Sequence, residues 1–299
     1  MASIVEPGPS GWDTLQLGDP STVPAEPPSE LLYHHQTRFF ASLRRLWAHR
    51  EIVYTLAERD FRAQYKQATL GIMWALLSPV LTLAILIIVF SRAKTFGTEH
   101  LPFALYAFVG ILCWSYFAAS LGTGGNALLT NKALLSKTQF PRECFPLGTM
   151  TVSGINTVLS WIPLAILFVV FGRAPAIATL WTPLFMAIEV VFAAGVTLAV
   201  SGLIIQMRDL VQVLPVLISL GLFVEPVIWP FYRIPKYLQP IYSFLNPLGP
   251  VIDNVRRTML HGWAPNWGLV GIAALGAVTY LLLGYRIFKR LEVQFADIA

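Results

Sequence analysis

The side chains best suited to acid–base chemistry in this chain are two carboxylates inside long apolar runs, Glu189 and Glu225. An ionisable group is costly in hydrocarbon, so it usually faces protein or water and marks a functional position. A proton-coupled carrier would need at least one of the two to titrate during transport. Glu225 precedes Pro226, so we expect it to stabilise backbone N–H groups freed at a helix break. For Glu189 the sequence suggests no specific role.

The spacing of residues gives no support for a metal site, a disulfide or a nucleotide-binding loop. Cys113 lies in an apolar run and Cys144 in a loop, and the 5 histidines form no His-x-x-x-His pattern. A Gly-x-x-x-x-Gly-Lys-Ser/Thr loop, which would cradle phosphates, is absent, and the glycine cluster at 122–125 is followed by Asn126 rather than lysine. We therefore expect no catalytic site, no metal and no cofactor in this chain.

Aromatic side chains form one face of a helix predicted at 103–123. They recur every three or four residues, with Gly110 completing the series: Phe103, Tyr106, Trp114 and Phe117. At about 1.5 Å per residue, Trp114 lies roughly 16 Å from Phe103, near the bilayer midplane and beyond the interfacial aromatic belt. Such a face either packs against a neighbouring helix or lines a conduit in which sugar rings stack on aromatic planes. Weaker candidates for the same surface are Trp74, Phe223 and Trp229.

The elements that carry these side chains are membrane helices. Hydrophobic residues make up 56% of the chain and charged residues only 12%, against about 25% in soluble domains. Apolar runs of sufficient length predict an all-α polytopic membrane protein with six transmembrane helices, and they lack the alternation of β-barrel strands. The predicted spans are 70–91, 103–123, 146–171, 180–205, 211–231 and 267–285.

The segments around the spans have their own patterns. Residues 1–36 are acidic, rich in proline and free of Lys and Arg, which predicts a disordered cytoplasmic tail. Helical spacing of apolar and basic residues over 37–69 predicts an amphipathic interfacial helix, with a soluble packing helix as the alternative. The prolines and apolar residues of 232–266 predict short re-entrant outer helices before the last span of a transmembrane domain at 70–290. Residues 291–299 complete the chain as a cytoplasmic tail.

The topology follows from the distribution of basic residues. They are more frequent in the loops on the side of the N-terminus, so the positive-inside rule places both termini in the cytoplasm. The same layout explains the net charge of +5, and we expect no nucleic-acid partner.

The junction from Arg59 to Pro79, where a basic segment meets the first apolar run, resembles a known family. Its pattern is Arg59, Tyr65, Lys66, Leu70, Gly71, Trp74 and Pro79. Further motifs follow in matching order: Lys132, Lys137, Phe140, Pro141 and Arg142, then Glu225 to Pro230, then Asn246, Pro247, Arg256 and Arg257. Over residues 37–290 the chain is similar to the permease subunit of ABC-2 polysaccharide exporters, the Wzm/TagG-like group that handles O-antigen, teichoic acid or galactan.

The resemblance implies the transport mechanism and the partners. A homodimer would recruit two copies of a cognate ABC ATPase, which binds ATP and Mg²⁺. The complex would export an undecaprenyl- or polyprenyl-diphosphate-linked glycan across the cytoplasmic (inner) membrane, through an aromatic-lined channel at the dimer interface. A galactan for cell-wall biogenesis is a cargo compatible with the composition. Membrane lipids complete the expected partners.

The resemblance also implies residue roles at the two ends of the pathway. Contacts with the ATPase fall on Arg59, Arg62, Lys132, Lys137, Arg142, Arg208 and Asp209, and each basic residue among them serves equally well as a positive-inside anchor. The outer gate would include Glu225, Asn246, Arg256 and Arg257, and we expect its two arginines to meet phosphate or lipid headgroups.

Three alternatives differ in function. An ABC-2 exporter of a lipid or drug is the runner-up within the same superfamily. An ion-coupled secondary carrier is disfavoured because such carriers commonly have internal repeats with paired broken helices, and only one apolar run is broken by prolines. A membrane glycosyltransferase is disfavoured because the aspartates near the membrane surfaces have no close acidic neighbour that would hold a metal.

Overall fold

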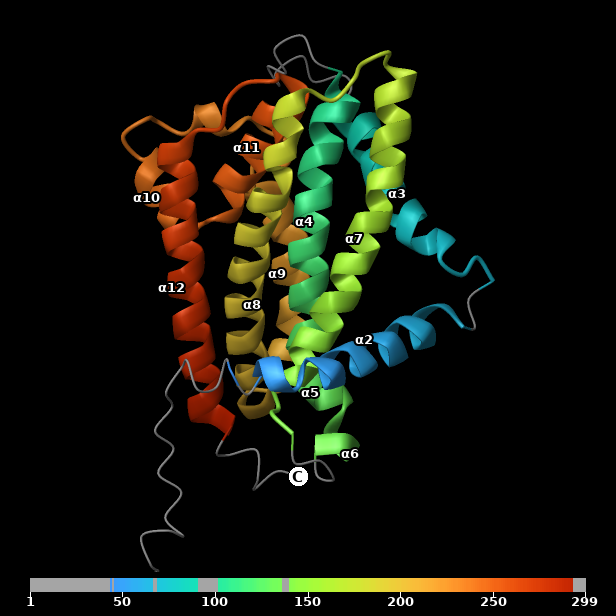
Figure 1. Ribbon diagram of the computed structural model, residues 1–299, viewed down its shortest axis with the longest axis vertical. Helices are drawn as coiled ribbons and strands as arrows, with labels where there is room; N and C mark the ends of the chain where they lie inside the picture. Colours follow the sequence, from blue (N-terminus) through green and yellow to red (C-terminus); the bar gives the residue numbers. More distant parts are fainter. Residues whose placement is uncertain (1–43, 45, 67–68, 91–101, 136–139, 293–299) are drawn as a thin grey trace, which may run out of the picture. The chain divides into compact units, whose positions relative to one another are not determined.

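A computed structural model describes residues 44, 46–66, 69–90, 102–135 and 140–292, and this part of the chain is built of helices joined by turns (Figure 1). The predicted tail at 1–36, most of the tail at 291–299, and Lys137 lie outside the described residues.

Five helices in the described part of the chain are long and apolar enough to cross a membrane. They follow the predicted spans closely, because long apolar runs decide both length and position. Their bounds are Met73–Phe90 (α3), Phe103–Gly125 (α4), Cys144–Val170 (α7), Thr182–Gln206 (α8) and Trp267–Glu292 (α12). A short 3-10 helix, Ile177–Trp181 (η2), leads into α8.

The predicted span at 211–231 requires a correction. Helix α9 covers only Leu210–Val224, 15 residues, or about 22 Å at 1.5 Å per residue, which is less than the ~30 Å of a hydrocarbon core. It ends at Glu225, whose backbone is extended with ψ 150°, because Pro226 disfavours helical geometry in the residue before it. The described chain therefore has five long helices and a shorter sixth in place of six full spans.

Helix α2 (Arg50–Tyr65) runs across one end of the helix bundle, near the short helices α5 (Ala127–Thr130) and α6 (Lys132–Leu135) (Figure 1). We call this end the α2 face. Helix α2 buries Leu56 and Ala57 against α7, where Gly148 allows close approach: a Cβ there would lie 3.2 Å from the Cβ of Leu56. One side of α2 is thus fixed to the bundle and the other is exposed.

The opposite end, the α11 face, is formed by η3 (Phe231–Arg233), α10 (Gln239–Leu245) and α11 (Leu248–Leu260) (Figure 1). These short helices occupy the region where we predicted short outer helices. Helix α11 packs against α4, α8 and α12, and most of its residues are buried. Their depth in a bilayer stays a prediction.

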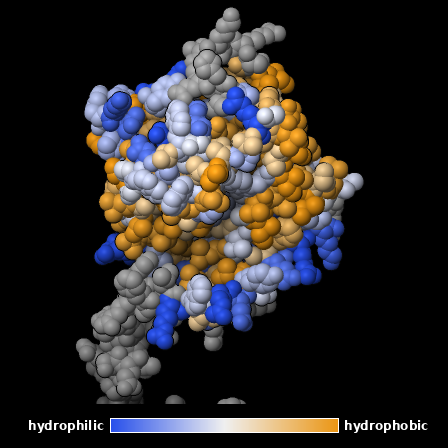
Figure 2. All heavy atoms as spheres, turned by 45° about the horizontal axis from the view of Figure 1, so that its top comes forward, coloured by the Kyte–Doolittle hydropathy of each residue, from blue (hydrophilic) through white to orange (hydrophobic). Residues whose placement is uncertain are grey.

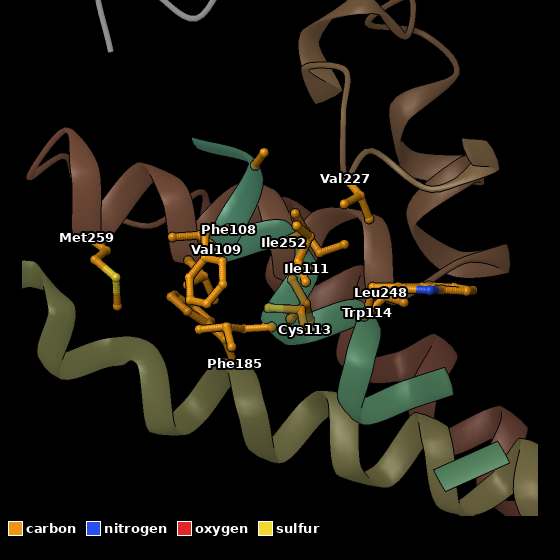
Figure 3. Packing of buried hydrophobic residues seen from close by; sticks show 14 of the residues in the cluster. Phe108, Val109, Ile111, Cys113, Trp114, Phe185, Val227, Leu248, Ile252 and Met259 are labelled. Atoms are coloured by element: carbon orange, nitrogen blue, oxygen red, sulfur yellow. The ribbon is translucent and has the colours of Figure 1, made fainter. Parts of the chain in front are cut away.

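Helix α4 lies at the centre of the packing. It contributes Phe108 and Ile111 to the main hydrophobic core, together with Phe185 of α8 and Ile252 of α11 (Figure 3). Outside this core the surface is also apolar: Figure 2 shows hydrophobic residues over a broad area of the visible surface, with hydrophilic residues grouped near its edges. A surface of this kind suits contact with lipid.

Helices α8 and α12 approach closely at Gly195 and Gly284. A Cβ placed on Gly284 would overlap the carbonyl oxygen of Gly195, and one on Gly195 would overlap the backbone of Tyr280. Small residues at such crossings let two membrane helices come into backbone contact.

Candidate functional site

Arg256 is the central residue of the α11 face. Its side chain is 2% exposed, and Nε donates to the carbonyl oxygen of Tyr106 at 3.0 Å. Nη1 donates to the carbonyl of Pro226 at 2.6 Å and Nη2 to that of Val227 at 2.5 Å. The guanidinium also lies 3.7 Å from the centre of the Tyr106 ring. Arg256 therefore ties the segment after α9 to α4.

The hydrogen bonds of Arg256 go to backbone carbonyls, and its predicted contact with phosphate or lipid headgroups stays a prediction. The break at Pro226 leaves carbonyl groups without helical partners, and buried carbonyls need donors. A guanidinium supplies five N–H donors in a planar fork and meets that need. Gly110 of α4 makes the room, because a Cβ there would overlap Nη2 of Arg256.

Glu225 and Asn246 are joined on the same face. Asn246 Nδ2 donates to Glu225 Oε1 at 2.8 Å and to the Tyr242 hydroxyl oxygen at 2.9 Å. Glu225 thus accepts from a side-chain amide rather than from the freed backbone N–H groups that we expected. The contact fastens the end of α9 to the end of α10.

The other two polar residues singled out in the sequence lie apart from this pair. Arg257 is partly exposed, and its Nε donates to the Ala264 carbonyl at 2.6 Å. Glu189 is fully buried in α8, and neither of its carboxyl oxygens has a hydrogen-bond partner among the described residues.

The aromatic face of α4 points into the protein. Trp114 is 8% exposed and lies so close to α9 that a Cβ on Gly221 would overlap its indole. Its ring is 5.8 Å from Phe117, which stacks on Phe192 of α8 at 5.2 Å with an interplanar angle of 8°. Trp114 and Tyr106 are thus both buried within this single chain, and their role in a channel stays a prediction.

The remaining aromatic candidates differ in exposure. Phe103 and Phe117 are partly buried, as is Trp229, whose Nε1 donates to the Phe223 carbonyl at 3.2 Å. Trp74 of α3 and Phe223 of α9 are 48% and 56% exposed. Few residues of these two helices are buried. In α3 they are Pro79, Leu83 and Leu86, and in α9 only Leu214.

Arg59 connects two elements of the α2 face. Its Nη2 contacts Asp60 Oδ1 and Asn131 Oδ1, both at 2.7 Å, so α2 is bonded to the turn between α5 and α6. Arg62 forms an ion pair with Glu58 one turn earlier in α2. The other described residues predicted to contact an ATPase lie on exposed positions of α6 and of the α8–α9 connection: Lys132, Arg208 and Asp209.

A buried ion cluster on the α2 face was not foreseen from the sequence. Lys289 Nζ of α12 lies 2.5 Å from Glu143 Oε1 and 2.6 Å from Glu292 Oε2. Glu143 is 3% exposed and also accepts from the Tyr285 hydroxyl at 3.2 Å. Arg142, whose contact with an ATPase stays a prediction, donates from Nη1 to the Glu292 carbonyl at 2.9 Å. These contacts fix the end of α12 to the start of α7.

Tyr65, at the end of α2, adds a hydrogen bond to the apolar packing of α2 on α7. Its hydroxyl donates to Asn156 Oδ1 at 2.8 Å. Burial raises the pKa of the Tyr65 phenol above its usual 10.0, and the bond to Asn156 opposes this only in part. Tyr65 therefore stays protonated and donates to Asn156 at physiological pH.

Comparison with known proteins gives a consistent result. Residues 51–260 match the model of the family described as ABC-2 type transporter. The chain is 26% identical over 258 residues to the O-antigen export system permease protein RfbA of Myxococcus xanthus, covering 85% of this chain and 98% of that protein. It is also 26% identical to an RfbA of Klebsiella pneumoniae, covering 83% and 95% of the two chains. The polysialic acid transport protein KpsM of Escherichia coli is 21% identical, with 78% and 91% covered.

Proposed function

The chain belongs to the ABC-2 type transporter family, and we propose that it is the transmembrane subunit of an ATP-driven exporter of a lipid-linked polysaccharide. One observation carries this proposal: the similarity to an O-antigen export system permease and to a polysialic acid transport protein extends over nearly the whole length of those relatives. Membrane-spanning helices and the family together identify an integral inner-membrane protein.

An ABC ATPase partner follows from the family, and the proposed docking surface is the exposed side of α2 with its neighbours. The α2 face presents the basic side chains of Arg62, Lys132 and Arg208, and this supports its assignment to the cytoplasmic side. Because α2 packs on α7 and Arg59 bonds to Asn131, movement of a docked ATPase would reach α7 and the turn between α5 and α6.

The proposed conformational signal then passes along α4 to the other face. Helix α4 runs from the α11 face to the α2 face (Figure 1), and Arg256 bonds its Tyr106 carbonyl to the segment after α9. A shift of α4 along its axis would thus pull on Pro226 and Val227. The nearby Glu225–Asn246 contact would move with them, which supports an outer gate in this region.

The proposed channel forms between two copies of the chain. Helices α3 and α9 have largely exposed apolar surfaces in the single chain, and a second copy would cover them. Trp74 and Phe223 are the predicted channel residues that could face a conduit in this state, since aromatic planes suit the C–H faces of sugars. Trp114, which packs against Gly221 of α9, would reach it only if α4 and α9 separated.

Deletion of the gene in its own host tests this proposal. We expect surface polysaccharide to be lost while polymer linked to lipid accumulates in membrane extracts, and a copy supplied on a plasmid should restore the surface polymer. Unchanged surface polysaccharide, with an altered lipid content or drug resistance, would instead favour the lipid or drug exporter.

A further inference from the structure

A pocket of about 310 Å³ lies on the α11 face, between η3, the end of α11 and the connection at 261–266. Tyr106 and Arg256 form its inner wall, with the guanidinium held against the Tyr106 ring. Its other prominent side chains are basic or aromatic: Lys236, Arg257, His261 and Trp263. All of these residues belong to the described part of the chain.

Positive charge dominates the pocket. Its lining includes three basic side chains, Lys236, Arg256 and Arg257, and one carboxylate, Asp253. Arg256 uses its hydrogen bonds for backbone carbonyls, which do not cancel its charge. Lys236 is exposed and has no ion pair within the described residues. An anionic group would therefore be attracted here.

Arg257 is held in a fixed position for binding. Its Nε donates to the Ala264 carbonyl at 2.6 Å, and its guanidinium lies 5.2 Å from the centre of the Trp263 ring. The bond to Ala264 occupies Nε and leaves the two Nη groups for a ligand. A guanidinium already fixed loses little conformational freedom on binding, and its fork matches phosphate oxygens.

The aromatic wall adds a flat surface beside these cations. The rings of His261 and Trp263 stack with centroids 4.5 Å apart and an interplanar angle of 23°. The cavity is near the lower end of the roughly 300–1,000 Å³ typical of ligand pockets. It therefore has room for a small group, such as one phosphate with one sugar or glycerol unit, and not for a length of polymer.

We propose that this pocket binds a phosphate ester, with the phosphate between Lys236 and Arg257 and the organic part against the His261 and Trp263 rings. Such an ester occurs in membrane-lipid headgroups and in soluble or polymer-borne sugar phosphates. The proposal does not depend on polysaccharide being the cargo, because a lipid or drug exporter would present the same pocket to the same esters.

Calorimetric titration of the purified full-length chain in detergent tests this site. Glucose 1-phosphate should bind and glucose should bind at least about tenfold more weakly, because charge-assisted hydrogen bonds carry the affinity. The Lys236→Gln/Arg257→Gln variant should lose about tenfold or more in affinity for glucose 1-phosphate. Arg233→Gln removes one positive charge in η3 outside the pocket lining; it is the matched control for Lys236→Gln alone and should bind as the unmodified chain does.

Competition with short-chain phosphatidylglycerol separates the two sources of the ester. Displacement of glucose 1-phosphate would identify lipid headgroups as occupants, whereas no displacement would identify sugar phosphates; both results support a phosphate-ester site. Equal binding of glucose and glucose 1-phosphate, or equal affinity of the double variant and the control, would overturn it. If the double variant aggregates, Lys236→Gln alone decides, and unchanged affinity in that variant would overturn the proposal.

Discussion

Arg256 of α11 donates from Nε to the carbonyl oxygen of Tyr106 in α4 at 3.0 Å, while its guanidinium lies over the Tyr106 ring at 3.7 Å. The same side chain holds the carbonyls of Pro226 and Val227. The buried guanidinium of Arg256 therefore connects the start of α4 to the helix break at Pro226, which lies 30 residues before Arg256 in the sequence.

Replacing Arg256 tests the importance of this connection. Arg256→Gln removes most of the donors and leaves buried carbonyls unpaired, at about 1–3 kcal/mol each. We expect a clearly lower melting temperature in detergent and loss of export. Arg256→Lys should recover only part of the stability, because a lysine lacks the planar fork. Arg233→Gln provides the control on the same face, and a melting temperature for Arg256→Gln equal to that of this control would contradict the assigned role.

The Glu225–Asn246 contact can be tested by exchanging its partners. Asn246→Asp sets two carboxyl groups against each other and should lower stability by about 1–3 kcal/mol and reduce export. Glu225→Gln keeps an acceptor oxygen for Asn246 and should be tolerated. The double change Glu225→Gln/Asn246→Asp restores a donor and an acceptor and should recover export.

The outcome of that exchange also separates two classes of protein. Export measured for each variant should rank the double change above Asn246→Asp alone. If the double change did not restore export, the Glu225–Asn246 contact would not be required for export. Loss of transport in Glu225→Gln alone would favour the ion-coupled carrier, which needs a group that titrates.

The close crossing of α8 and α12 predicts that folding depends strongly on the size of the side chain at position 284. Gly284→Ala should disrupt folding, since its Cβ would overlap the Gly195 carbonyl, and overpacking of this kind costs about 1–3 kcal/mol or more. Gly271→Ala lies in the same helix with no atom within 4 Å of the added Cβ and should be neutral. The yield of monodisperse protein in size-exclusion chromatography provides the comparison, and equal yields would argue against close contact at this crossing.

Charge reversal on α2 tests docking of the ATPase. Arg62 is a suitable position, because its side chain is 73% exposed and its ion pair with Glu58 lies at the surface, where such pairs are worth about 0–1 kcal/mol. Arg62→Glu should therefore reduce the amount of ATPase that co-purifies without lowering the melting temperature. Arg59→Glu should reduce both, since Arg59 also bonds to Asn131.

The control for docking is Arg233→Glu, a charge reversal on the opposite face. It should leave the ratio of ATPase to permease unchanged. If Arg62→Glu lowered only the amount of permease in the membrane, with that ratio intact, α2 would be an anchor and the docking surface would lie elsewhere.

The long helices were predictable because an apolar run of sufficient length leaves few other structures open to it in a membrane. The length of the apolar run gave a wrong span at 211–231, because apolar residues continue past the helix break at Pro226. Hydropathy does not register that proline lacks an N–H group. The chain around Val227 therefore counted as part of a span, although it is irregular.

Roles that depend on partners distant in sequence could not be predicted. Arg256 and Arg257 are neighbours with the same charge, yet about 100° of helix rotation buries the first against backbone carbonyls and leaves the second partly exposed. Trp114 is buried because Gly221 of another helix leaves space for its ring. Lys289 forms an ion pair with Glu143, which is far away in the sequence, and no spacing rule connects residues at such a sequence separation.

Reconstitution tests the central claim most directly. The permease and its ATPase would be placed in liposomes that carry labelled, lipid-linked polysaccharide on the leaflet facing the ATPase, and protection of the label from an added glycosidase would be measured over time. We predict protection that requires ATP and disappears with a hydrolysis-deficient ATPase. Polymer that stays fully accessible while the same complex moves a labelled lipid or dye would contradict the account.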